Sequence, residues 1–139
     1  MTDRETLLLA QWFSPGFPVG AFAYSHGLET AIREDVVRDG ASLEVWLSEV
    51  LAFGTGRTDA ILLRAAFRAP NDAHAVDQLA NAYAASAERL TEATDQGHAF
   101  ARAVRAAWGT EVPDLLYPVA VGVAGARHLV DVDRLVAMY

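Results

Sequence analysis

Acidic side chains are the groups of this chain best suited to chemistry, and they gather in two places. One group ends a predicted helix and the other lies along one face of a longer predicted helix: Glu29, Glu34 and Asp35, and Glu88, Glu92 and Asp95. Glu88 and Glu92 are like charges at i and i+4, a spacing that costs about 0.2 to 0.5 kcal/mol in a helix. The pattern leaves two interpretations open: a solvated acidic face, or an acidic docking patch for a basic partner.

The histidines and the remaining polar motifs do not form a recognisable catalytic or metal-binding set. The four histidines are scattered, with no H-x-x-x-H spacing and no cysteine in the chain: His26, His74, His98 and His128. Neighbouring residues on a helix point about 100° apart, so His26 is not placed to act as a base toward Ser25. We therefore predict no catalytic residue and no metal ligand, and only a transient role for His26 stays open.

Gly54-Thr55-Gly56-Arg57-Thr58-Asp59 superficially suggests a phosphate-binding loop. A P-loop needs a lysine that reaches the phosphates and a strand before it. This chain has no lysine, and no strand pattern precedes the segment. We interpret the segment as a turn between two helices, so that any GTPase involved is a partner.

The segment from Ser14 to Glu29 carries unusual local constraint. Pro15 and Pro18 fix φ near about −65°, and two glycines permit positive φ beside them. A stiff loop of this kind suits partner docking, because ordering it on binding costs little. The predicted partner-binding residues are Phe17, Pro18, Val19, Tyr24, Ser25 and Glu29. The alternative is that Phe17 and Phe22 plug the end of a helical bundle.

The elements that position these residues all follow helical periodicity, and we predict an all-α fold, a single helical bundle with no β-sheet. The expected helices run from Asp3 to Phe13, from Ala21 to Glu34, from a Ser42 cap onward, from Thr58 or Asp59 to Arg68, from Ala73 to Trp108, from Pro118, and from an Asp131 cap. In the third of these, core-facing spacing is shown by Leu43, Trp46, Leu47, Val50 and Leu51.

The pattern from Val76 to Trp108 is a heptad-like seam that forms one helix, or two with a break near Ser86. Small residues occupy its middle, namely Ala87, Gly97 and Ala101, and they allow another helix to approach closely. Gly97 costs about 1 kcal/mol relative to alanine inside a helix, which indicates a packing reason or a break. The stripe is our candidate dimer interface, with burial inside the monomer as the competing outcome.

Composition excludes several classes of function. The 139 residues suit one domain, and the hydrophobic content of 53% argues against disorder. The net charge of −7 argues against nucleic acid or an anionic membrane as the main partner. No segment is apolar over the roughly 18 to 20 residues that span a bilayer, and the N-terminus lacks the basic-then-apolar arrangement of a signal peptide. We therefore expect a cytoplasmic protein.

The residues from Ser14 to Glu29, S-P-G-F-P-V-G-A-F-A-Y-S-H-G-L-E, resemble the N-terminal signature of the UreF-type urease accessory proteins. That signature reads roughly S-P-x-(L/F)-P-(V/I)-G-(A/G)-(F/Y)-x-(Y/H)-S-x-G-L-E. The match continues in the same order with Trp46-Leu47, Asp59, Glu88-Arg89, Gln96-Gly97, Pro118 and Gly122. The family's C-terminal segment is missing, so we expect residues 1–139 to be a UreF-like all-α domain truncated before the family's C-terminal helices.

The resemblance implies a non-catalytic assembly factor. Such a protein forms a homodimer, binds the accessory protein UreD (UreH in some organisms) and the GTPase UreG, and assists nickel insertion into apo-urease. It binds no cofactor tightly, because nickel is handled by the complex. The alternative from a different class is a small all-α enzyme that uses Glu29, His26 or Glu88 as acid or base groups.

Overall fold

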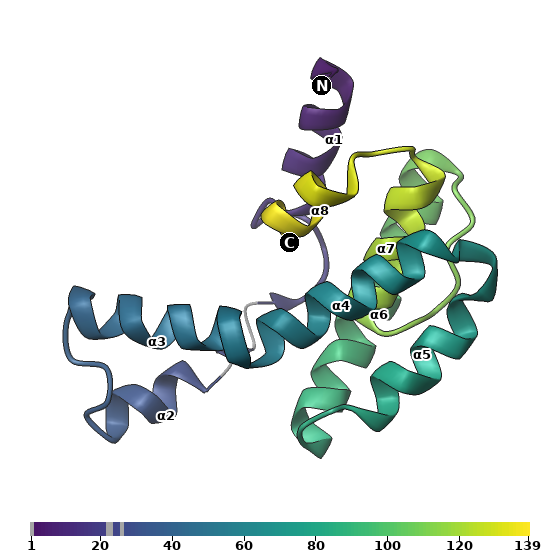
Figure 1. Ribbon diagram of the computed structural model, residues 1–139. Coiled ribbons are helices and arrows are strands. Elements are labelled where there is room, and N and C mark those ends of the chain that lie inside the picture. The colour runs from purple at the N-terminus through teal and green to yellow at the C-terminus, as the bar shows by residue number, and fades with distance from the viewer. Residues whose placement is uncertain (1, 22–23, 26) are drawn as a thin grey trace.

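The computed structural model describes residues 2–21, 24–25 and 27–139, and every regular element in this part of the chain is helical (Figure 1). The predicted all-α class is therefore confirmed. The elements are α1 Asp3–Trp12, α2 Leu28–Arg33, α3 Gly40–Phe53, α4 Thr55–Arg68, η2 Pro70–Asp72, α5 Ala73–Ala82, α6 Ala87–Trp108, α7 Tyr117–Arg127 and α8 Val132–Met138.

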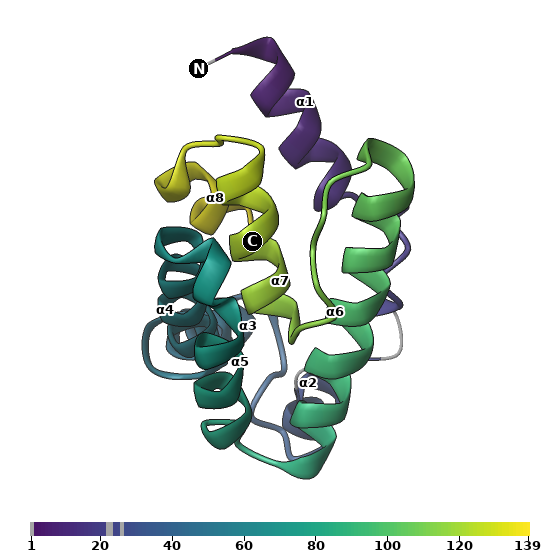
Figure 2. The ribbon, with the colours of Figure 1, turned by 90° about the vertical axis from the view of Figure 1, so that its right-hand side faces the viewer.

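Helix α7 is the centre of the core, with α4 and α6 on either side of it (Figure 2). Pro118 stands in its first turn, where the missing N–H costs nothing, and the residues from Pro118 to Gly125 are all buried. A Cβ atom on Gly122 would lie 2.4 Å from the carbonyl oxygen of Leu63, so only glycine allows α4 to cross this closely. A helix that is apolar on all sides belongs inside a domain, and α7 lies there.

Helix α6 lies beside α7 and is separated from α5 by a short turn, so the seam forms two helices. Ser86 caps α6 with its side chain, which accepts a hydrogen bond from the N–H of Arg89. Gly109 ends the helix in the left-handed region at φ 65°. The extended segment after α6 folds back along the helix toward α7, and its backbone at Leu115 to Tyr117 packs directly on Gly97.

Helix α1 closes one end of the core through aromatic packing. Trp12 is 1% exposed, and its ring meets those of Phe100, Trp108 and His128 edge to face, with centroids 5.3 to 6.3 Å apart. Edge-to-face contacts of this kind add to the stabilisation from burial alone. The N-cap is Thr2 and not the expected Asp3, which occupies the first helical position.

Helices α2 and α3 form an arm that extends away from the core (Figure 1). Among the described residues, the main hydrophobic core contains none from either helix, and α3 has no buried residue. The prediction that α3 turns Leu47 and Leu51 toward a core is therefore wrong, because among the described residues the core takes no side chain from this helix. Both side chains are exposed.

Local chemistry also moves three predicted helix starts. Helix α2 begins at Leu28 and not near Ala21, because Gly27 precedes it in the left-handed region at φ 86°. Asp39 caps α3 in a reciprocal arrangement with Ser42, which was the expected cap. Helix α4 begins at Thr55, directly after the break at Gly54. The predicted cap of the last helix, Asp131, is confirmed.

Candidate functional site

A polar groove lies where the start of α4, the turn before α6 and the loop before α2 meet. Two adjoining hollows of about 290 and 410 Å³ share Thr55, Ala85 and Arg89 in their walls. The smaller is mostly apolar and opens beside Phe53 and Tyr83, which are both exposed. The larger is lined by polar residues of the loop and of α6, including Tyr24, Ser25, Glu88 and Glu92. Arg89 therefore stands in the wall that the smaller compartment shares with the larger one, which also contains Glu88 and Glu92.

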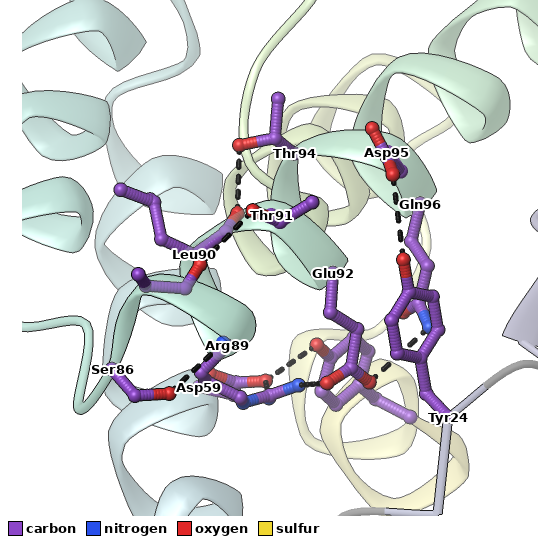
Figure 3. A network of polar contacts seen from close by, with 12 residues as sticks. Tyr24, Asp59, Ser86, Arg89, Leu90, Thr91, Glu92, Thr94, Asp95 and Gln96 are labelled. Atoms are coloured by element: carbon purple, nitrogen blue, oxygen red, sulfur yellow. Dashed lines mark hydrogen bonds and ion pairs between the residues drawn. The ribbon is translucent and has the colours of Figure 1, made fainter.

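Arg89 is the hub of an ion-pair network that joins α4 and α6 (Figure 3). Its Nη2 lies 3.0 Å from Oδ2 of Asp59, and its Nη1 lies 2.9 Å from Oε2 of Glu92. The side chain of Gln96 donates to Glu92 over 3.3 Å. The hydroxyl of Tyr139 donates to Asp59 over 2.8 Å, which ties the end of the chain to α4.

The network sets the ionisation of its members. Burial lowers the pKa of Arg89, but the negative charges of Asp59 and Glu92 outweigh it, so its pKa is raised and the guanidinium stays charged. Burial and the nearby Asp59 raise the pKa of Tyr117 to about 12. The same two causes raise the pKa of the Tyr139 hydroxyl well above its usual value. Two carboxylates surround one guanidinium, so the network carries net negative charge beneath the groove.

The acidic face of α6 is divided between buried and exposed groups. Glu92 is only 4% exposed, so the interpretation of a fully solvated acidic face is wrong at this position. Glu88 and Asp95 remain exposed. Tyr24, from the loop before α2, donates its hydroxyl to Oδ2 of Asp95 over 3.3 Å, and burial and Asp95 raise the pKa of Tyr24. The loop is thereby held over this face (Figure 3).

The structure separates the predicted partner-binding residues into three places. Phe17 and Val19 are half-buried and pack on the core, and the Phe17 ring lies 5.6 Å from that of Phe100 and 6.3 Å from that of Trp108. Pro18 between them is exposed. Tyr24 and Ser25 line the groove, whereas Glu29 is exposed on α2. The alternative expectation for Phe17, a plug at the bundle end, agrees with its packing.

Phe22 and His26 lie outside the described residues, so their expected roles stay predictions. The other histidines are on different elements. His74 is exposed on α5 and His98 is half-buried on α6, while His128 lies 2.9 Å from the hydroxyl of Thr110 through its Nε2. In the part of the chain that the structure describes, no three His, Asp or Glu side chains gather so that they could hold a metal ion.

The candidate dimer stripe on α6 packs mainly within the monomer. Ala101 is completely buried, and a Cβ atom on Gly97 would lie 2.0 Å from the carbonyl oxygen of Leu115. Only Ala87, at the start of α6, is exposed. This is the competing outcome stated for the stripe, and a surface for self-association has to be sought elsewhere on the chain.

The sequence reasoning missed the ion-pair hub. Arg89 and Glu92 stand at i and i+3 on a predicted helix, a spacing that brings opposite charges together. That signal was available, although the partner on another helix, Asp59, is 30 residues away in the chain. Its pairing depends on how α4 crosses the bundle, which periodicity does not give.

Fold and site together define an all-α protein with a groove above a buried ion-pair network. The UreF family model matches residues 37–139. A urease accessory protein UreF of Roseobacter denitrificans is 49% identical over 140 residues, which cover 100% of this chain and 63% of that relative. One of Cereibacter sphaeroides is 54% identical over 132 residues, covering 95% and 62%. The chain belongs to the UreF family.

The relatives are longer than this chain. A third, the urease accessory protein UreF of a Ruegeria species, is 50% identical over 141 residues that cover 100% of this chain and 66% of that protein. The chain thus spans a little under two thirds of the length of each of these relatives. Of the helices described, none is long and apolar enough to cross a membrane.

Proposed function

We propose that this chain is part of a non-catalytic urease accessory factor that works in a urease assembly complex. The observation that carries this is membership of the UreF family, with relatives named as urease accessory proteins across the whole chain. Its partners in this proposal are UreD (or UreH), the GTPase UreG and apo-urease, and the complex assists nickel insertion. Nickel is cargo of the complex, and no metal site of this chain is invoked.

The groove beside α6 supports a docking role. Its larger compartment exposes Glu88 beside the buried pair of Arg89 and Glu92, so a partner meets a negative surface. Tyr24 borders the same compartment with an aromatic body and a hydroxyl that is already held by Asp95. Aromatic groups in fixed positions are typical of interface hot spots, because they lose little freedom on binding. A partner with basic side chains around an apolar residue fits this arrangement.

The test is capture of purified UreD and UreG by the immobilised chain. We expect retention of one or both, and weaker retention by Glu88→Arg, which reverses an exposed charge at the groove without touching the core. Glu111→Arg makes the same change at an exposed position on the segment after α6, outside the groove, and should leave capture unchanged. Equal loss in both variants would assign the effect to net charge, and no capture by the folded parent chain would contradict the proposal.

A further inference from the structure

The smaller hollow of the groove is an apolar cup between several helices. Its floor contains buried side chains from α4, from α5 and from the start of α7, namely Leu62, Ala80 and Pro118. Its volume of about 290 Å³ lies just under the range of about 300 to 1,000 Å³ that is typical of small-molecule sites. A hollow of this size and lining suits a single large apolar side chain better than a whole small molecule.

Two exposed aromatic rings stand at the mouth of this hollow. Phe53, the last residue of α3, is 82% exposed, and Tyr83, the C-cap of α5, is 70% exposed. Both line the hollow. Large apolar groups that are open to solvent beside an apolar hollow mark an interaction site, and tyrosine is enriched at such sites because its ring is apolar and its hydroxyl is wet. A side chain that enters the hollow therefore passes between two rings.

The charges around the two hollows show what kind of segment fits them. Among the described residues of their lining, one guanidinium stands against three carboxylates: Arg89 against Asp59, Glu88 and Glu92. Arg89 already contacts Asp59 at 3.0 Å and Glu92 at 2.9 Å (Figure 3), whereas Glu88 is exposed to solvent. The lining thus has an excess of negative charge, which favours a basic partner and disfavours an acidic one.

From this juxtaposition we infer that the groove binds a basic segment of a partner protein, whose large apolar side chain enters the smaller hollow between Phe53 and Tyr83. A lysine or arginine next to that side chain lies in the larger hollow beside Glu88. The two hollows share part of their walls, so neighbouring side chains of one segment reach both. The inference rests on the proposed function and adds the chemistry that the partner presents. The apolar anchor supplies most of the affinity, and the basic residue adds specificity and a faster encounter.

The first test measures the Kd of purified UreD and UreG for the immobilised chain at low and at high salt. Phe53→Ala and Tyr83→Ala remove exposed rings, so the helical circular dichroism spectrum and the urea midpoint should not change. Each should raise the Kd of the captured partner about 10-fold at both salt concentrations. Glu88→Gln should instead reduce the salt dependence of the Kd. Leu7→Ala is the matched control, 65% exposed on α1 and outside both hollows, and should bind like the parent.

The second test identifies the segment that occupies the hollow. The photo-crosslinking amino acid p-benzoylphenylalanine is placed at the position of Tyr83, and the chain is irradiated in the presence of the captured partner. Mass spectrometry should locate the crosslink in a segment with a large apolar residue beside a lysine or arginine. The same amino acid at the position of Leu7 is the control and should give little crosslink.

Three outcomes would overturn the inference and leave the proposed function standing: capture that is indifferent to both Phe53→Ala and Tyr83→Ala, a crosslinked partner segment that is acidic or has no large apolar residue, or a crosslink to a second copy of this chain in place of the partner. Absence of any capture by the folded parent chain would contradict the inference and the proposed function together. The two failures are therefore distinguishable.

Discussion

Replacing Arg89 with methionine tests how much the ion-pair network that links α4 to α6 stabilises the fold. The substitution keeps most of the side-chain volume but leaves Asp59 and Glu92 without the guanidinium that contacts them at 3.0 and 2.9 Å. Removing one partner of a fully buried pair costs about 3 to 5 kcal/mol. The Arg89 and Asp59 side chains are 17% and 15% exposed, so solvent screens part of this, and we expect about 2 to 4 kcal/mol.

The assay is urea unfolding followed by circular dichroism at pH 7. Asp59→Asn in the Arg89→Met background should recover part of the loss. A cost below about 1 kcal/mol, as for a surface pair, would refute the argument.

Three further predictions concern the core and its aromatic end. Gly97→Ala should lower the free energy of unfolding by about 1 to 3 kcal/mol despite the better helix propensity of alanine, because the new Cβ would lie 2.0 to 2.7 Å from backbone atoms. Gly40→Ala is the control: its Cβ meets open space, so in urea unfolding it should be neutral or stabilising. Phe17→Ala should lower the melting temperature, at a cost of about 2 to 4 kcal/mol for a half-buried ring, and an unchanged melting temperature would return Phe17 to the predicted docking surface. Burial, and after it the charge of Arg4, lowers the pKa of His128 below 6.5. The stability that neutral His128 contributes is therefore present above about pH 6.5 and is lost as the pH falls through its folded pKa. Over that pH range the parent should lose stability relative to His128→Gln, and parallel stability profiles of the two proteins would contradict this.

Periodicity and capping chemistry predicted much of the fold. The all-α class, the two-helix alternative for the seam and the Asp131 cap follow from local rules that act within a few residues. The predicted start of α2 was wrong because helical spacing over residues 21–34 does not reveal that Gly27 adopts a positive φ. The predicted orientation of α3 was wrong for a different reason. An apolar face shows that a helix needs a cover, but not whether the cover belongs to the same chain.

The candidate site was harder to predict from the sequence than the fold. Tyr24 and Ser25 do line the groove, and Glu88 lies beside them. Glu92 looks like its exposed neighbour Glu88 in the sequence, and only the folded arrangement, with α4 and α6 on either side of α7, brings Asp59 to Arg89 beside it. Gly97 correctly indicated close packing, and the backbone it packs on is the segment from Leu115 to Tyr117 that leads into α7. Tertiary contacts between distant segments decide these cases.

The central claim is that the chain acts in urease assembly, and the most direct measurement is the nickel content of urease purified from a host that lacks its own UreF. The host produces apo-urease, UreD and UreG, with this chain, with its Glu88→Arg variant, or with an empty vector. The account predicts more nickel per urease, and more urease activity, with the chain than with the empty vector, and an intermediate value for the variant. Nickel content at the empty-vector level, with the chain folded and abundant in the same cells, would contradict it.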